Sequence, residues 1–276
     1  MTLTEALAWA TGRLEATSDS PRQDAEILLA HQLGLSRGQL FTRLRESLAA
    51  VDAEAFEEQV ARRVRQLPVA YLTGDQGFWT LMLKVTPAVL VPRPETELLV
   101  EWGLERLAHI ATPRIADLGT GSGAIALALA SELPQARVLA TDASPEALAV
   151  ARGNAVELGL ERVEFRQGHW CEPLAGESFD LIVSNPPYIA AGDPHLPALR
   201  HEPLSALTDG ADGLQCLREI VAAAPPQLVP GGWLLVEHGY DQGEAVRALF
   251  VAAGLVGVQT RRDLGGQERA TAGRRA

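Results

Sequence analysis

Short apolar stretches alternate with amphipathic ones from residue 114 onward, and this alternation restricts the fold more than any other feature. The stretches that predict strands are RIADL, RVLATD, VEFRQ, FDLIVS and GGWLLVEHG. We expect a helix after each of the first two. Alternating strands and helices are typical of a doubly wound parallel sheet of the α/β class. The last stretches, VGVQTRRDL and ERATAGRR, predict two final strands that we expect to pair antiparallel.

Residues 1–74 show repeated helix starts and no strand pattern. The pairs that fit a capping box are Thr2/Glu5, Ser20/Gln23 and Ser36/Gln39, and Asp52 is expected to cap a further helix. We therefore predict a small bundle of four or five helices. In residues 75–97, the stretches FWTLMLKV and AVLV predict a β-hairpin that links the bundle to a domain at 98–276.

Composition narrows the class of protein. A formal net charge of -11 argues against broad binding to a nucleic-acid backbone, which requires a positive surface. Two cysteines and six histidines show neither a disulfide framework nor metal-ligand spacing. Apolar runs stay short of the roughly 18 residues that a membrane span requires. We interpret the N-terminal stretch as a helix instead of a signal peptide, and we expect a cytoplasmic protein without metal.

A glycine-rich loop follows the strand RIADL and precedes a helix. Its candidate cofactor-binding residues are Asp117, Gly119, Thr120, Gly121, Ser122 and Gly123. Glycines allow a sharp turn and a close approach of the backbone to a ligand. Asp142 ends the next strand, where a carboxylate can bind the ribose of a nucleotide. The pattern D-x-G-x-G-x-G favours S-adenosylmethionine, while G-x-G-x-x-A, completed by Ala124, leaves NAD as an alternative.

A second motif, SNPPY, follows the strand FDLIVS. The two prolines fix φ and remove two donors, which ends the strand and stiffens the loop. The Asn185 side-chain carbonyl and the Pro186 backbone carbonyl are then exposed acceptors, suited to the two hydrogens of a planar NH2 group. Tyr188 supplies a flat ring that can stack on such a group. We expect this motif at the same sheet edge as the glycine loop.

These two motifs together predict methyl transfer to a planar amine. An amide or exocyclic amine is a poor nucleophile, and fixed carbonyls that accept both N–H groups hold its nitrogen against the methyl group. The candidate catalytic residues are Asn185, Pro186 and Tyr188, and Pro187 completes the substrate-binding set. The acceptor remains open between a protein glutamine and adenine in DNA or RNA. A binding module without catalysis is a further alternative, and the intact motifs argue against it.

The chain resembles the HemK/PrmC family of release factor glutamine methyltransferases over nearly its whole length. The resemblance includes PVAYLTG, VLVPRPETELLVE, DLGTGSGAIALALA, VSNPPYI and VEHGYDQGEAV, of which PRPETE is the most family-specific. It implies a seven-stranded, Rossmann-like class I methyltransferase domain behind a helical N-terminal domain for substrate recognition. It also implies that S-adenosylmethionine is the methyl donor, leaving as S-adenosylhomocysteine. The substrate implied is the glutamine N5 of the Gly-Gly-Gln motif in class 1 peptide-chain release factors; a ribosomal-protein glutamine is an alternative.

The resemblance also assigns roles at matching positions. Trp170 is expected to pack on the adenine, and Asn185 lies near the transferred methyl group as well as the substrate. His169 stands where the family usually has an acid, so a carboxylate for the adenine amino group is in doubt. Arg93 and Glu95 are expected to border the substrate cleft. We expect a monomer whose partner is a release factor, with neither membrane nor nucleic acid bound directly.

Overall fold

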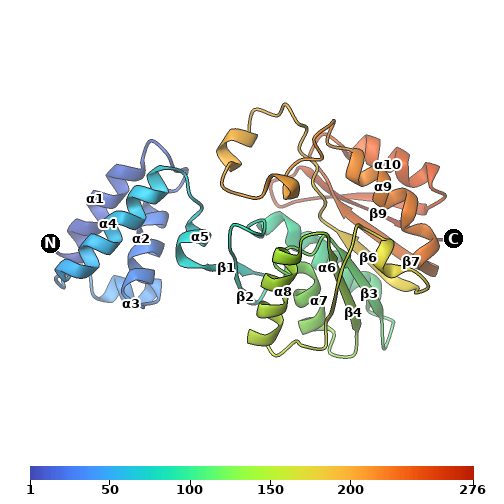
Figure 1. Cartoon of the computed structure of the whole chain (residues 1–276), viewed down its shortest axis with the longest axis horizontal. Coiled ribbons are helices and arrows are strands. Elements are labelled where there is room, and N and C mark those ends of the chain that lie inside the picture. Colours follow the sequence, from blue (N-terminus) through green and yellow to red (C-terminus); the bar gives the residue numbers. More distant parts are fainter. The chain divides into compact units, whose positions relative to one another are not determined.

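The computed structural model describes residues 1–276, which form two compact units, Met1–Asp75 and Gln76–Ala276 (Figure 1). The first unit contains helices, and the second contains a seven-stranded sheet. No helix in the chain combines the length and the apolar character that crossing a membrane requires.

Five helices form the first unit, as predicted. They are α1 (Leu3–Leu14), α2 (Pro21–Gln32), α3 (Arg37–Thr42), α4 (Ala50–Val64) and α5 (Val69–Thr73). The capping boxes at Thr2 and Ser36 are confirmed, because each side chain accepts the N–H three residues on, and that residue's side chain accepts the cap N–H. Leu7, Leu28 and Phe56 are fully buried in the core of this unit.

One predicted helix start in this unit is wrong, and one predicted capping box is absent. α2 begins at Pro21 directly after Ser20, as predicted, but the Ser20 hydroxyl donates to the Asp24 carboxylate at 3.4 Å and accepts no backbone N–H. Asp52 does not cap α4, because this helix already begins at Ala50. The Asp52 carboxylate accepts a hydrogen bond from Gln32 of α2 instead, so it joins two helices.

A hairpin is present, but with different strands from those predicted. β1 (Asp75–Phe78) and β2 (Leu81–Lys84) form a two-stranded sheet. The predicted second strand, AVLV at residues 88–91, is wrong because this stretch has no strand structure. Its backbone contacts a side chain instead: the Val91 N–H donates to the Glu202 carboxylate at 3.0 Å.

Seven strands form the sheet of the second unit, in the order β5-β4-β3-β6-β7-β9-β8. Their bounds are β3 (Arg114–Leu118), β4 (Arg137–Asp142), β5 (Glu164–Gln167), β6 (Phe179–Ser184), β7 (Leu228–Glu237), β8 (Val256–Arg262) and β9 (Glu268–Arg274). The strands β3 to β7 are parallel, and β9 is antiparallel to β7 and β8. The prediction of a doubly wound sheet with a final antiparallel pair is confirmed.

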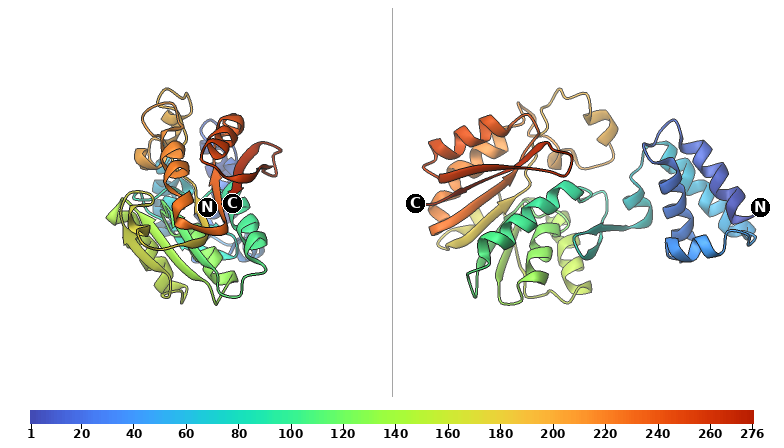
Figure 2. Two further views of the ribbon diagram at one scale, coloured as in Figure 1. Left: turned by 90° about the vertical axis from the view of Figure 1, so that its right-hand side faces the viewer. Right: turned by 180° about the vertical axis from the view of Figure 1, so that it is seen from behind.

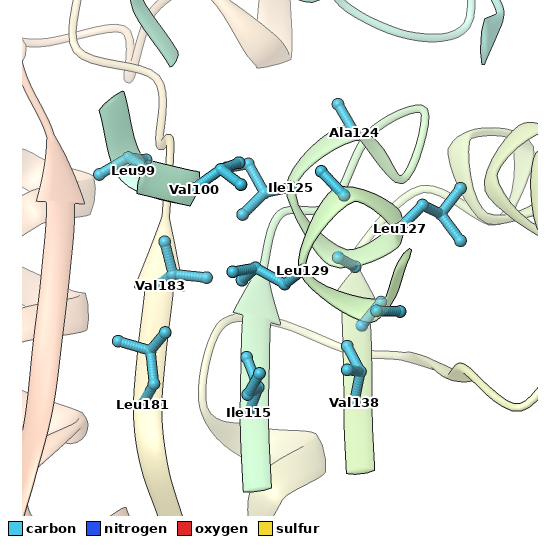
Figure 3. Packing of buried hydrophobic residues seen from close by; sticks show 14 of the residues in the cluster. Leu99, Val100, Ile115, Ala124, Ile125, Leu127, Leu129, Val138, Leu181 and Val183 are labelled. Atoms are coloured by element: carbon cyan, nitrogen blue, oxygen red, sulfur yellow. The ribbon is translucent and has the colours of Figure 1, made fainter. Parts of the chain in front are cut away.

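Helices cover both faces of this sheet (Figure 2). The five are α6 (Glu97–Leu107), α7 (Ala124–Glu132), α8 (Pro145–Glu157), α9 (Gln215–Ala223) and α10 (Gly243–Ala252), and the 3-10 turns are η1 (Pro94–Thr96), η2 (Glu172–Leu174), η3 (Leu196–Leu199), η4 (Leu204–Ala206) and η5 (Pro225–Gln227). Figure 3 shows Ile125 and Leu129 of α7 packed above Ile115, Val138 and Val183 of the strands. Helices α9 and α10 pack in a second buried cluster.

The carboxyl ends of the central strands meet at one edge of the sheet. Leu118 at the end of β3 is opposite both Thr141 of β4 and Ser184 of β6, and Ser184 is opposite Val236 of β7. The residues that follow these positions therefore lie side by side, although they come from distant parts of the sequence. In such sheets this edge is where ligands bind.

Candidate active site

The glycine loop connects β3 to α7 in a conformation that requires glycine. Gly119, Gly121 and Gly123 have φ values of 71°, 56° and 86°, in the left-handed region. A Cβ atom at Gly119 would lie 3.1 Å from the Trp170 ring, and one at Gly123 would lie 2.9 Å from Leu127. A Cβ at Gly121 would meet nothing within 4 Å, so the backbone there is open to a ligand.

Asp142 holds this loop from the end of the neighbouring strand. Its Oδ2 accepts from the Gly121 N–H and its Oδ1 accepts from the Ser144 N–H, both at 2.9 Å. Burial raises the pKa of Asp142, and the backbone donors act in the opposite direction. The carboxylate lines the large cavity described below, where its remaining lone pairs can accept from a ligand hydroxyl.

Asp117 lies beneath the loop and is fully buried. Its Oδ2 accepts from the Thr120 hydroxyl at 2.6 Å and from the Ala126 N–H at 3.2 Å, and its Oδ1 has no partner. Burial raises the pKa of Asp117 to about 7. Asp117 and Gly123 do not line the cavity, while Thr120 does. The structure thus gives Asp117 contacts within the loop, and its contact with a cofactor stays a prediction.

Trp170 forms one wall of the cavity with an unusual backbone. Its φ is 43°, and its ring lies against the Gly119 position. The indole Nε1 donates to Glu219 Oε2 of α9 at 3.1 Å, and His169 Nε2 lies 2.9 Å from the same oxygen. Glu219 of α9 thus places a carboxylate beside His169. The two residues lie 50 positions apart in the sequence, and sequence reasoning did not find this contact.

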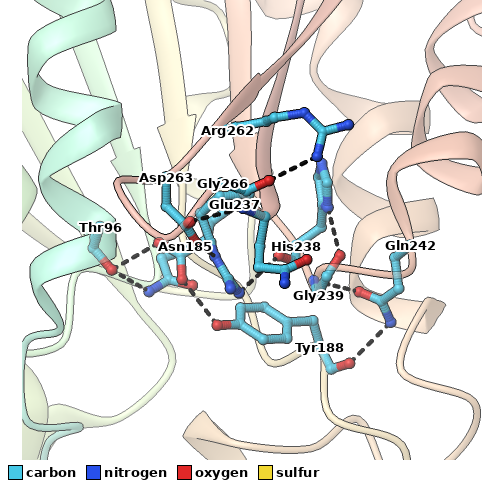
Figure 4. A network of polar contacts seen from close by, with 12 residues as sticks. Thr96, Asn185, Tyr188, Glu237, His238, Gly239, Gln242, Arg262, Asp263 and Gly266 are labelled. Carbon is cyan, nitrogen blue, oxygen red and sulfur yellow. Dashed lines mark hydrogen bonds and ion pairs between the residues drawn. The ribbon is translucent and has the colours of Figure 1, made fainter.

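The SNPPY loop begins where β6 ends. The Asn185 Nδ2 donates to the Thr96 hydroxyl at 3.1 Å, and the Tyr188 hydroxyl donates to Glu237 at 2.9 Å (Figure 4). The Tyr188 backbone carbonyl accepts from Gln242 at 3.0 Å. Burial and the adjacent Glu237 carboxylate raise the pKa of Tyr188, so this hydroxyl stays protonated. The loop is therefore held at both ends.

Two cavities open on this edge, and Asn185 stands between them. The larger has a volume of about 600 Å³ and is lined by the glycine loop, Asp142 and Trp170. The smaller has a volume of about 220 Å³ and is lined by Pro186 and Tyr188. The residues that line both are Leu90, Arg93, Asn185 and Ala206, and Pro187 lines the larger alone. A group in one cavity can meet a group in the other beside the Asn185 side chain.

Three buried polar residues at these cavities were missed by sequence reasoning, and one of them, Thr96, lines the larger cavity. Thr96 and Glu237 are 4% and 1% exposed and bind each other at 2.7 Å. Burial raises the pKa of Glu237, and the hydrogen bonds from Thr96 and Tyr188 act in the opposite direction. Glu202 forms an ion pair with Arg93 at the smaller cavity. The available signal for Glu237 was a charged residue at the end of the apolar strand GGWLLVE.

His238 follows Glu237, and its ring is occupied within the chain. Its Nδ1 lies 2.8 Å from the Gly239 carbonyl and its Nε2 lies 2.9 Å from the Thr271 hydroxyl. Burial lowers its pKa. These contacts and the burial of the ring give His238 a structural role.

The fold and its domains define a methyltransferase of Rossmann-like architecture. A structure described as a methyltransferase from Pyrococcus furiosus aligns with a TM-score of 0.54 at 18% identity, over 80% of this chain and 99% of that one, which shows the fold alone. Residues 95–201 match the methyltransferase small domain, and residues 5–74 match the PrmC N-terminal domain.

Curated relatives define the family. A release factor glutamine methyltransferase from Xylella fastidiosa (strain Temecula1) is 57% identical over 97% of this chain and 96% of its own length. One from Escherichia coli (strain K12) is 46% identical over 96% of both chains. The chain belongs to the family of release factor glutamine methyltransferases.

Proposed function

We propose that this protein transfers a methyl group from S-adenosylmethionine to the side-chain amide nitrogen of the Gly-Gly-Gln glutamine in class 1 peptide-chain release factors. The observation that carries the proposal is the position of Asn185 between a cavity of nucleoside size and a narrower one that a side chain can enter. The names of the relatives support the same substrate.

The residues of the larger cavity fit S-adenosylmethionine. A volume of about 600 Å³ lies within the range of small-molecule sites. The open backbone at Gly121 allows close approach, and the Asp142 carboxylate stands at the end of β4, where ribose hydroxyls can donate to it. The Trp170 ring offers an apolar face for the adenine. We assign cofactor binding to these residues and to Gly119, Thr120 and Ser122 beside them.

The chain's own residues position the nitrogen that is methylated. When bound, S-adenosylmethionine supplies an electrophilic methyl group on a positively charged sulfur. The Asn185 Oδ1 and the Pro186 carbonyl accept the two amide hydrogens of the glutamine and hold its nitrogen at the boundary of the two cavities. Positioning of this kind can supply about 7–11 kcal/mol of a reaction barrier. Tyr188 donates to Glu237 and therefore contributes a surface and not a base.

Labelled S-adenosylmethionine offered with three substrates tests the proposal. They are a class 1 release factor, its Gln→Ala variant in the Gly-Gly-Gln motif, and duplex DNA. We expect label in the first alone. Label in DNA and not in the release factor would show that the methyl acceptor is adenine, which carries the same planar NH2 group, and not glutamine. Equal label in the release factor and in its Gln→Ala variant would refute the assignment of the acceptor residue.

We further propose that residues 1–74 recognise the release factor outside its Gly-Gly-Gln loop. The match of residues 5–74 to a separate domain family supports a role distinct from catalysis. Hydrogen exchange of the full chain with the Gln→Ala release factor tests this. Amides of residues 1–74 should exchange more slowly in the complex, and unchanged exchange throughout this region would contradict the proposal.

A further inference from the structure

A chain of three side chains ends at the Asn185 amide. Glu237, the last residue of β7, accepts from the Thr96 hydroxyl through Oε2 at 2.7 Å. Thr96, the last residue of η1, accepts in turn from Asn185 Nδ2 at 3.1 Å. Figure 4 shows these side chains converging from three separate segments. The β6–β7 register, with Ser184 opposite Val236, brings Asn185 next to Glu237.

We propose that Thr96 and Glu237 are positioning residues that fix which end of the Asn185 amide faces the substrate. Their arrangement turns the NH2 group inward and the carbonyl toward the two cavities. The site is thereby set to receive a donor, the NH2 of an amide or amine, and to reject an acceptor such as a carboxylate. This inference rests on the proposed function, because a carbonyl in this position has use only with a donor substrate.

The direction of the hydrogen bonds follows from counting protons. Burial raises the pKa of Glu237, but both of its oxygens act as acceptors in this arrangement, Oε2 from the Thr96 hydroxyl and Oε1 from the Tyr188 hydroxyl. The single hydroxyl proton of Thr96 is therefore directed at Glu237. Its oxygen can then only accept from Asn185, which must present its NH2 group. The reverse orientation would place the Asn185 carbonyl against a lone pair of Thr96.

Burial makes this choice of orientation strict. Glu237 is 1% exposed, and Thr96, which lines the larger cavity, is 4% exposed, so water has little access to either hydrogen bond. An unsatisfied buried polar group is costly, and the penalty is larger when the group is charged. The Tyr188 hydroxyl on the other oxygen of Glu237 adds a second constraint, because it ties the far end of the SNPPY loop to the same carboxylate.

A pair of substitutions at Thr96 tests the proposal with labelled S-adenosylmethionine and a release factor. Thr96→Val keeps the shape and removes the hydroxyl, while Thr96→Ser keeps the hydroxyl. We expect kcat to fall about tenfold to a hundredfold in Thr96→Val, as for the loss of a buried hydrogen bond. KM and cofactor affinity by calorimetry should change little, and Thr96→Ser should recover kcat to within about threefold of wild type. Wild-type kcat in Thr96→Val, or equal losses in both variants, would overturn the inference.

Discrimination between substrates gives a readout that a purely structural role would not change. Wild type should bind the release factor more tightly than its Gln→Glu variant in the presence of S-adenosylhomocysteine. In Thr96→Val the Asn185 amide is free to turn its NH2 outward, so this ratio should shrink. An unchanged ratio would count against the positioning role.

A second variant covers the case in which Thr96→Val fails to fold. Glu237→Gln has nearly the same volume, and its amide can donate to Thr96, which releases the Thr96 proton toward Asn185. We expect a lower kcat, and wild-type kcat would overturn the inference. If wild type labels DNA instead of the release factor, only the proposed function fails. The ratio of the kcat of each variant to that of wild type is then measured with DNA as the substrate.

Discussion

The cofactor side and the substrate side of this site are built in different ways. The larger cavity rests on a continuous strand–loop–helix segment, in which Asp142 holds Gly121 from the adjacent strand. On the substrate side, the Asn185 amide is held by Thr96, which is held in turn by Glu237. Thr96 is separated from Asn185 by 89 positions in the sequence and from Glu237 by 141. The glycine loop could therefore be found from a local sequence pattern, whereas the contacts that hold Asn185 are tertiary.

The largest effect is expected from Asn185→Ala, which should impair the substrate side of the site and leave the cofactor side nearly intact. Asn185→Ala removes the carbonyl that accepts from the amide, so we expect turnover to fall about a thousandfold, by analogy with the loss of one preorganised polar group in an active site. Cofactor affinity should fall far less, because the larger cavity keeps its glycine loop. Label transfer and calorimetry measure the two quantities. Near-normal turnover would show that the SNPPY loop does not place the acceptor.

The contribution of Asp117, which lies beneath the glycine loop, to the free energy of unfolding should depend on pH. Burial raises the pKa of Asp117 from 3.8 to about 7, so the folded state holds a proton that the unfolded state releases. The free energy of unfolding that depends on Asp117 is therefore highest below pH 4 and falls as the pH rises from about 4 to 7. A shift of three units corresponds to at most about 4 kcal/mol.

Asp117→Asn isolates this contribution, because an amide of the same shape does not titrate. Its free energy of unfolding should rise relative to wild type between pH 4 and pH 7, as measured by urea unfolding at several pH values. A constant difference between the two proteins across this range would contradict the raised pKa.

Local patterns were predictable from sequence, and long-range side-chain contacts were not. The capping boxes at Thr2 and Ser36 depend on residues three apart, and the sheet follows from the alternation of strands and helices. Asp52 was misassigned because α4 begins two residues earlier, at Ala50, and the Asp52 carboxylate binds Gln32 of another helix. The stretch AVLV forms no strand, and its Val91 N–H donates instead to Glu202, 111 residues away, a contact that no local pattern predicts.

A glycine substitution tests how strictly the cofactor side depends on its loop. Gly119→Ala adds a Cβ 3.1 Å from the Trp170 ring at a φ of 71°, which costs about 1–3 kcal/mol. We expect weaker cofactor binding by about tenfold or more. Gly153→Ala in α8 is the matched control, since nothing lies within 4 Å and helical alanine stabilises by about 0.5–1 kcal/mol. Equal behaviour of the two variants would refute the close packing at Gly119.

Removal of the Asp142 carboxylate should affect the same side without creating a clash. Asp142→Ala loses an acceptor for the ribose and the hydrogen bond to the Gly121 N–H. We expect cofactor binding to weaken by about 1–3 kcal/mol, while the KM for the release factor stays within about twofold. Calorimetry with S-adenosylhomocysteine measures the affinity, and an unchanged affinity would exclude Asp142 from cofactor binding.

The smallest expected effect concerns the ion pair at the rim of the smaller cavity. Glu202→Gln keeps an acceptor for the Val91 N–H and removes the charge that holds Arg93, whose side chain is 34% exposed. Glu202 itself is buried, but Gln keeps an oxygen that can accept from the Arg93 guanidinium, and solvent screens the exposed Arg93 end of the pair, so we expect a loss of about 1 kcal/mol. We expect the KM for the release factor to rise up to about fivefold with unchanged cofactor affinity, because Arg93 is less well ordered where the glutamine enters. A loss of cofactor affinity instead would mean that Arg93, which lines both cavities, acts on the nucleoside side, and the separation of the two sides would then fail at this residue.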